Sequence, residues 1–168
     1  MSNLKARESL ERAKRIFLEK PEAGRRPNTA ATAVLHEGLS CEVSGPTAER
    51  ALTDMPEAMG GTSTGSNPGW LFRAGMASCA ATSIAMRAAQ LGIALSALEV
   101  KVESESDARG LVGIPDIPTA LGNLRMSVTI GAEGVDEARL RELAAWGEQH
   151  SPVGCTLRDR PGVALEVV

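Results

Sequence analysis

The chain has 168 residues, which fits one domain or one subunit of a small oligomer, and its hydrophobic content of 43% is sufficient for a core. Aromatic residues make up only 2%, so the core has to be built from aliphatic side chains and alanine. The net charge is −3 and Lys and Arg form no basic stripe, which argues against a nucleic-acid-binding protein.

The N-terminal third predicts one helix followed by a β-meander. Apolar residues recur at helical spacing over residues 4–20, and Pro21 ends this helix. A stretch rich in Pro, Gly and Arg comes next, so residues 1–28 are expected to form an N-terminal helix and linker. Three short strands are then expected over residues 29–35, 39–44 and 51–55.

A long central helix is predicted to follow the meander. Asn67 is a good N-cap, Pro68 fits the first helical position, and Gly92 provides the stop after Leu91. Such a helix is roughly 34 Å long. Its residues are apolar or small on all sides, so we expect it to be buried and closely approached by other backbones.

The C-terminal half predicts two half-buried strands, a second helix and a closing strand. Apolar and charged residues alternate over residues 98–105 and again over 124–130, with a proline-containing loop between them. Helical spacing over residues 135–150 predicts the second helix, and Ser151-Pro152 ends it. A last strand is expected over residues 163–168, and the whole order predicts an α+β fold.

The sequence contains no disulfide framework and no targeting segment that we recognise. Its cysteines number three, without a Cys-x-x-Cys pair, and residues 1–21 are charged and amphipathic rather than signal-like. The most apolar run, residues 74–95, includes Arg87 and Gln90, which a membrane span would have to bury. The chain is therefore expected to be cytoplasmic, with reduced thiols available for chemistry.

Cys79 is the first candidate for chemistry. It lies about three turns into the central helix, beyond the reach of the helix dipole, so its activation requires a neighbouring cation or hydrogen-bond donor. Without such a neighbour, Cys79 would be a small packing residue. Cys41 is expected to face the core. Cys155 follows the last helix in a predicted loop and would be a resolving thiol if that loop folds over Cys79.

The sequence does not favour a metal site or a phosphate-binding loop. His36, His150 and the cysteines match no zinc-ligand spacing, so no metal site is expected. The Gly/Thr/Ser loop over residues 60–66 precedes a helix, as a phosphate-binding loop does. It lacks the Gly-Lys-Ser/Thr ending, however, and is expected to be a flexible loop.

Two segments resemble motifs of the OsmC/Ohr family. Residues 67–79, Asn-Pro-Gly-Trp-Leu-Phe-Arg-Ala-Gly-Met-Ala-Ser-Cys, resemble the family pattern Asn-Pro-x-x-Leu-Phe-x-Ala-Gly-x-x-x-Cys. Residues 151–157, Ser-Pro-Val-Gly-Cys-Thr-Leu, look like the family motif Cys-Pro-Val-Ser-x-x-Leu. The order of predicted elements is also similar, and the resemblance covers nearly the whole chain after about residue 30.

This resemblance implies a single OsmC-like domain over residues 29–168 and an intertwined homodimer with two sites at the subunit interface. In family peroxidases the helix cysteine attacks the O–O bond of an organic or lipid hydroperoxide, becomes a sulfenic acid and condenses with a second cysteine. A dithiol reductant, often a lipoyl group, resets the pair, and no metal or cofactor is expected. The implied catalytic residues are Cys79, Cys155 and His36, and the implied pocket residues are Trp70, Leu71, Phe72 and Met76.

Three positions depart from the family pattern. The second cysteine of the family falls on Ser151, the activating Glu falls on Gly69, and the activating Arg falls on His36. Two functions are therefore predicted. The first is a thiol peroxidase acting through Cys79 with Cys155 as the resolving thiol. The alternative is a non-peroxidatic dimer that binds a small apolar ligand in its interface cleft.

Overall fold

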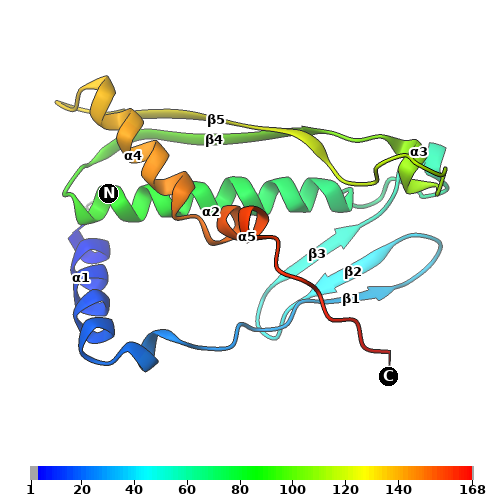
Figure 1. Cartoon of the computed structure of the whole chain (residues 1–168), viewed down its shortest axis with the longest axis horizontal. Coiled ribbons are helices and arrows are strands. Elements are labelled where there is room, and N and C mark those ends of the chain that lie inside the picture. The colour runs from blue at the N-terminus through cyan, green and yellow to red at the C-terminus, as the bar shows by residue number, and fades with distance from the viewer. Residues whose placement is uncertain (1–3, 168) are drawn as a thin grey trace. The chain divides into compact units, whose positions relative to one another are not determined.

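The computed structural model describes residues 4–167 and confirms the α+β fold class, with antiparallel sheets (Figure 1). The chain divides into two compact units. One consists of Ile16–Ala74, and the other combines the residues up to Arg15 with Gly75–Val168. Among residues 4–167, none of the helices combines the length and the apolar character that crossing a bilayer requires.

The N-terminal helix and the β-meander are confirmed. Helix α1 is followed by a short 3₁₀ turn over Pro21–Gly24. The three strands pair antiparallel in the order β1-β2-β3, and the turn between the first two is closed by the His36 amide, which donates to the Ser40 carbonyl at 2.8 Å. The bounds of these elements are α1 Leu4–Glu19, β1 Thr32–Leu35, β2 Cys41–Ser44 and β3 Arg50–Thr53.

The loop over residues 60–66, expected to be flexible, is fastened to the buried carboxylate of Asp54. This side chain accepts the amide and hydroxyl of Thr62 at 2.9 and 2.7 Å and those of Thr64 at 3.2 and 3.1 Å. The hydroxyl of Thr62 and then the surrounding amides hold the pKa of Asp54 well below its usual range. Gly61 is required here, because a Cβ would collide with the Met55 carbonyl.

The central helix α2 (Pro68–Gln90) begins and ends as predicted. The Asn67 carboxamide oxygen accepts the Gly69 amide at 2.8 Å, and Gly92 adopts a φ of 70° just beyond the end. The predicted burial on all sides is wrong for the single chain, because only one stripe is covered by other elements. The buried residues of this stripe are Met76, Ala80, Ser83, Ile84, Ala88 and Ala89.

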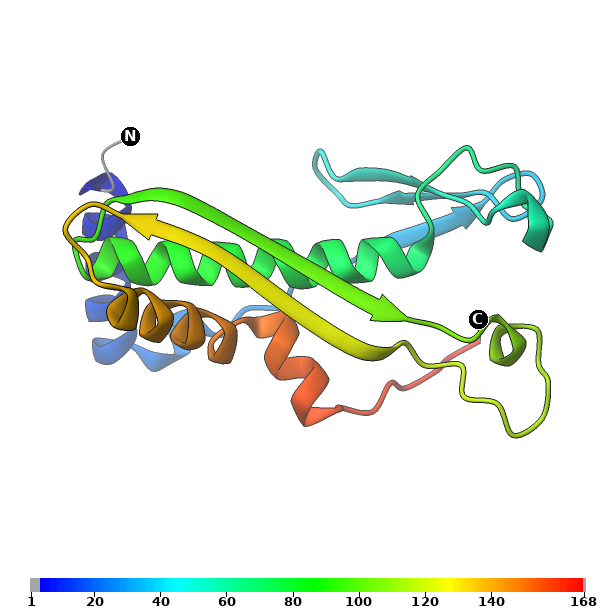
Figure 2. The same cartoon turned by 90° about the horizontal axis from the view of Figure 1, so that it is seen from above.

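Two long strands form the second sheet. β4 (Leu95–Glu105) and β5 (Gly122–Ala132) pair antiparallel and run alongside α2 in both views (Figure 1, Figure 2). Both strands extend beyond their predicted limits. The connection between them contains a short helix, α3 (Ala108–Leu111), that was predicted to be loop, and the Asp107 carboxylate caps it by accepting the Arg109 amide at 3.0 Å.

Helix α4 (Glu137–Gln149) packs directly on α2. Leu143 joins Ile84 and Ala88 in the core, and apolar side chains of β4 and β5 pack around them. A Cβ on Gly147 would lie 2.8 Å from the Ile84 Cα, so the glycine lets the two helices meet backbone to backbone. The small residue at this crossing is thus Gly147 of α4, whereas a Cβ at Gly75 of α2 would meet nothing within 4 Å.

The C-terminal region corrects two predictions. Cys155 lies in a helix, α5 (Pro152–Asp159), and not in a loop, because Ser151 provides an N-cap and Pro152 suits the first helical position. The predicted closing strand is absent over residues 163–167, which pair with no other strand of the described chain, and Val168 lies outside the described residues. A strand needs a partner to satisfy its backbone, and this segment has none within the chain.

Candidate functional site

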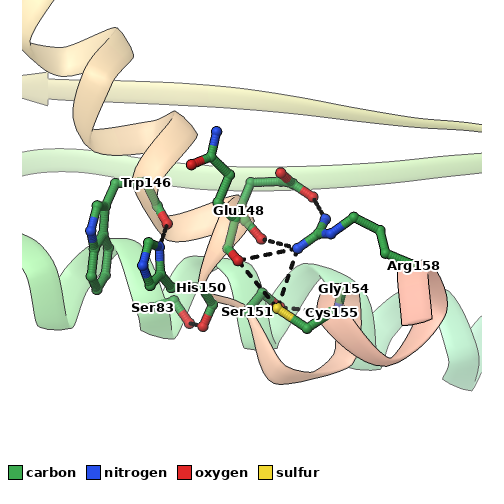
Figure 3. Close-up of polar contacts among 9 residues, drawn as sticks. Ser83, Trp146, Glu148, His150, Ser151, Gly154, Cys155 and Arg158 are labelled. Carbon is green, nitrogen blue, oxygen red and sulfur yellow. Dashed lines mark hydrogen bonds and ion pairs between the residues drawn. The ribbon is translucent and has the colours of Figure 1, made fainter. Parts of the chain in front are cut away.

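The corner between α4 and α5 holds one of the predicted site cysteines (Figure 3). The hydroxyl of Ser151, which is only 1% exposed, accepts the Gly154 amide at 3.4 Å and starts α5. Cys155 lies one turn further along and is half-buried. Its Sγ is 3.2 Å from the Gln149 carbonyl, which accepts the thiol hydrogen. The cap therefore fixes both the start of the helix and the direction of the thiol.

Arg158 links α5 to the end of α4. Its Nη2 donates to the Cys155 Sγ at 3.3 Å and to the carbonyls of Glu148 and Gln149 at 3.3 and 3.2 Å (Figure 3). Its Nη1 makes an ion pair with the Glu148 carboxylate. The hydrogen bond to Cys155, followed by the one to Glu148, raises the pKa of Arg158 above its ordinary value. A guanidinium is thus held against a thiol by three oxygen acceptors on α4.

An open cavity of about 530 Å³ adjoins this corner. Apolar side chains contributed by α2, β4, β5 and α5 line much of it, and arginines and one glutamate add charge at its rim. Such a mixed lining suits an apolar molecule with a polar end. The lining residues are Met76, Val102, Leu124, Arg125, Met126, Glu148, Gly154, Leu157, Arg158 and Arg160.

Cys79 is half-buried on the stretch of α2 that faces this region. Met76, three residues earlier, lines the cavity, and the Ser83 hydroxyl, four residues later, donates to the His150 carbonyl at 3.4 Å. At 100° per residue, Cys79 lies within about 60° of Met76 and about 40° of Ser83 around the helix axis. Cys79 therefore lies at the edge of the α2 face that Met76 and Ser83 direct to the cavity and the start of α5, and it is not among the residues that line the cavity.

The sulfur of Cys79 lacks the kind of partner that Cys155 has. Within residues 75–167, it makes no hydrogen bond and lies in no ion pair. Arg87, two turns further along α2, is directed elsewhere. Its guanidinium carbon lies 4.7 Å from the ring centroid of Trp146, which also stacks on His150 at 3.8 Å.

The other predicted site residues belong to the unit formed by residues 16–74, apart from Met76. His36 is exposed, and its Nε2 lies 3.3 Å from the Glu42 carboxylate. Leu71 lines a separate cavity of about 300 Å³ beside the meander. Trp70 is 51% exposed and Phe72 is half-buried.

Glu148 and Arg158 were missed as site residues. The prediction of a loop around Cys155 concealed the relation, because Cys155 and Arg158 face each other only when a helix brings residues i and i+3 together. The cap signal Ser151-Pro152 was present and would have revealed that helix. Cys41, expected to face the core, is half-buried in β2. Among residues 4–167, no group of three metal-ligating side chains gathers.

The comparisons with known proteins identify the family. A family model described as OsmC-like protein matches residues 60–166, which is more than half of the chain. The chain therefore belongs to the OsmC-like protein family, and the predicted relation to OsmC/Ohr proteins is confirmed. A comparison with curated proteins finds no match.

Solved structures of the family share the fold. The organic hydroperoxide resistance protein OsmC of Legionella pneumophila has 24% identity and a TM-score of 0.61, covering 80% of this chain and 91% of that one. The OsmC-like protein of Mycoplasma pneumoniae has 18% identity and a TM-score of 0.67, covering 80% and 89%. An organic hydroperoxide resistance protein of Elizabethkingia anophelis with bound thiocyanate has 20% identity and a TM-score of 0.59, covering 80% and 91%.

Proposed function

We propose that this chain is a thiol-dependent peroxidase that reduces organic or lipid hydroperoxides through Cys79, with Cys155 as the resolving thiol. Its membership of the OsmC-like family, with structural neighbours named organic hydroperoxide resistance proteins, supports the reaction class. The observation that carries the proposal is the face of α2 on which Cys79 lies. Met76 on this face lines the cavity beside Arg158, and Ser83 binds the backbone just before α5.

The chemistry has two steps. The Cys79 thiolate attacks one oxygen of the hydroperoxide, an S–O bond forms as the O–O bond breaks, and the alkoxide leaves and takes a proton. The Cys155 sulfur then attacks the sulfenic acid sulfur, an S–S bond forms, and the hydroxyl group leaves as water. A dithiol reductant, such as a lipoyl group, breaks this disulfide by exchange and is itself oxidised. The apolar side chains of Trp70, Leu71, Phe72 and Met76 are proposed to receive the hydrocarbon part of the substrate.

We also propose that residues 29–168 form a single OsmC-like domain and that two copies of the chain form a homodimer. One stripe of α2 has small or apolar residues that are exposed within residues 4–167, namely Ser78, Thr82, Ala85 and Met86. Three apolar residues near the C-terminus are each about nine-tenths exposed and occupy alternate positions, as in a strand with an uncovered apolar face. They are Val163, Leu165 and Val167. A second copy is the occupant that we propose for these surfaces.

An ordinary thiol is only a few per cent ionised at neutral pH, so Cys79 needs an activating group. His36 is our proposed cation, and it carries positive charge only when protonated. His36→Gln is expected to lower the rate of peroxide reduction several-fold. The matched control is Glu57→Gln, which changes an exposed charge of the same unit and is expected to leave the rate unaltered.

The decisive test is consumption of cumene hydroperoxide with a dithiol reductant. Cys79→Ser is expected to reduce turnover to background, Cys155→Ser to stop recycling after one oxidation, and Cys41→Ser to leave turnover unchanged. Equal turnover in the wild type and Cys79→Ser would refute the peroxidase proposal.

A second candidate function follows from the absence of a partner for the Cys79 sulfur within residues 75–167. In this alternative the dimer binds a small apolar ligand in its cleft and performs no peroxide chemistry. Labelling of sulfenic acid after mild peroxide treatment separates the two functions. Cys79 is labelled if it is peroxidatic. If it stays unlabelled and is alkylated quickly only above about pH 8, it is an ordinary thiol and ligand binding is favoured.

A further inference from the structure

We propose that Arg158 is the positioning residue that keeps Cys155 ready for nucleophilic attack, by stabilising its thiolate form. For its place in a catalytic cycle, the inference rests on the proposed peroxidase function. It concerns a pair of residues within one helix, Cys155 and Arg158, and so it can be tested without any peroxide.

The first step of the argument is the competition of charges at the Cys155 sulfur. Gln149 ends α4, so its carbonyl belongs to the negative end of the helix dipole and disfavours a negative sulfur. The Arg158 guanidinium, 3.3 Å from the same sulfur, carries a full positive charge and outweighs a partial one. Arg158 is therefore the group of this corner that we propose to stabilise the thiolate, against the Gln149 carbonyl that accepts the thiol hydrogen.

The second step concerns how the guanidinium is held. A flexible arginine on the surface loses most of its effect through solvent screening and side-chain entropy. The Arg158 side chain is 46% exposed, but it is bound by the Glu148 carboxylate on one nitrogen and by two α4 carbonyls on the other. Glu148 therefore orients the guanidinium rather than neutralising it. The Glu148 carboxylate and the Cys155 sulfur lie on opposite sides of the guanidinium (Figure 3).

The remaining charged groups around the corner are more distant or otherwise engaged. His150, the C-cap of α4, donates a hydrogen bond from its Nδ1 to the Trp146 carbonyl at 2.7 Å. Arg125 on β5 and Arg160 after α5 line the adjoining cavity but make no hydrogen bond to Cys155. Arg125 is thus a matched control, since its removal takes away one positive charge near the same cavity without touching the sulfur.

In the proposed catalytic cycle, the thiolate form of Cys155 matters in the step that resolves the sulfenic acid. The Cys155 thiolate attacks the sulfenic acid of Cys79, the S–S bond forms, and hydroxide leaves with the electron pair of the broken S–O bond and takes a proton from solvent. A sulfur that attacks as its thiolate needs no base to remove its proton in this step. By stabilising that form, Arg158 removes the need for a general base at the resolving thiol.

The experiment uses the full chain with Cys41→Ser and Cys79→Ser, so that Cys155 is the single thiol and its alkylation by iodoacetamide is followed against pH. Arg158→Gln is expected to slow alkylation at pH 7 by about tenfold and to move the curve by about one pH unit, with the same plateau at high pH. Arg158→Lys is expected to retain most of the wild-type rate, and Arg125→Gln to stay within about twofold of it.

Three results would overturn the inference: a curve for Arg158→Gln that superimposes on the parent, an equal shift in Arg125→Gln, or a higher rate at every pH. The last result would mean that Arg158 only holds α5 closed, because an opened helix exposes the thiol whatever its charge. Failure of peroxide turnover in the wild type would instead refute the proposed function and leave the alkylation result standing.

Discussion

The two cysteines of the proposed site occupy contrasting environments within the same unit. Cys155 lies at a helix corner with a guanidinium 3.3 Å away and a carbonyl 3.2 Å away. Cys79 lies among small residues on α2, half-buried, with no hydrogen bond to its sulfur within residues 75–167. One thiol therefore has its electrostatic partner on its own helix, whereas the other depends on a group from outside that helix and its immediate neighbours.

The contrast shows that similar burial does not give two cysteines similar electrostatic surroundings. Both thiols are half-buried, so exposure alone does not distinguish them. The difference lies in what the neighbouring elements present. α4 ends beside Cys155 and offers both carbonyls and Glu148, while the Cys79 sulfur makes no hydrogen bond within residues 75–167.

The largest effect is expected from breaking the crossing that supports both thiols. Gly147→Ala places a Cβ 2.8 Å from the Ile84 Cα, so α4 must move away from α2. The expected loss of unfolding free energy is about 2–3 kcal/mol, measured by urea denaturation. Gly122→Ala, where a Cβ meets nothing within 4 Å, is the matched control and is expected to change stability by less than about 0.5 kcal/mol. Equal stabilities of the two variants would contradict the close crossing.

The next prediction concerns the uncovered face beside Cys79. Thr82→Arg introduces a charge in the stripe that we assign to a second copy, and it is expected to weaken dimerisation by tenfold or more because a buried unpaired charge is costly. Light scattering after size-exclusion chromatography measures the assembly. Ala145→Arg, on an exposed position of α4, is the control and should leave the assembly intact. A Thr82→Arg protein that assembles like the wild type would leave this face of α2 without its proposed partner.

A smaller effect is expected at the cap that directs Cys155. Ser151→Ala removes the acceptor for the Gly154 amide and is expected to cost about 1 kcal/mol. Fraying of α5 should also speed alkylation of Cys155 at high pH. Ser9→Ala, at an exposed hydroxyl of α1, should shift stability by no more than about 0.5 kcal/mol. If Ser151→Ala matches that control, the cap contributes nothing measurable.

The smallest effect on the thiols is expected from Asp54, which lies in the other unit. Its lowered pKa means that its ionised form stabilises the fold above the ordinary carboxyl pKa of about 3.9, and this stability is lost as the pH falls below that value. Asp54→Asn should therefore be less stable than the wild type at pH 7 and should lose less stability between pH 5 and pH 2. Urea midpoints at each pH measure this, with Glu57→Gln as control. Alkylation of Cys155 at pH 7 should not change, and a change would contradict the independence of the two regions.

The sequence predicted elements where local signals agree. The caps Asn67 and Gly92 defined α2 almost to the residue, and alternation located both long strands. Prediction failed where the decisive interactions are not local. Nothing near residues 163–167 in the sequence reports that a partner strand is missing, and the eight-residue spacing between Asp54 and Thr62 resembles no turn pattern.

The candidate site was predicted only in part, because some of its contacts are not apparent from the local sequence. Family motifs drew attention to Cys79 and Cys155, and the chain is confirmed as an OsmC-like protein. The partner of Cys155 was overlooked because a loop was expected where Ser151-Pro152 starts a helix, and a loop gives no reason to look three residues ahead for Arg158. The roles of the cysteines and of His36 remain predictions.

The buried cap at Ser151 has a consequence for recognising distant relatives. A sulfur in its place would be a weak acceptor for the amide that begins α5, whereas a hydroxyl is a good one. Four residues correspond to about 6 Å of helix rise and a rotation of only about 40°, so Cys155 displays its sulfur on nearly the same side as position 151. In the proposed peroxidase, the second thiol thus lies one helical turn beyond the family position, and the helix start keeps a serine cap. Searches that demand cysteine immediately before proline would pass over every chain built in this way.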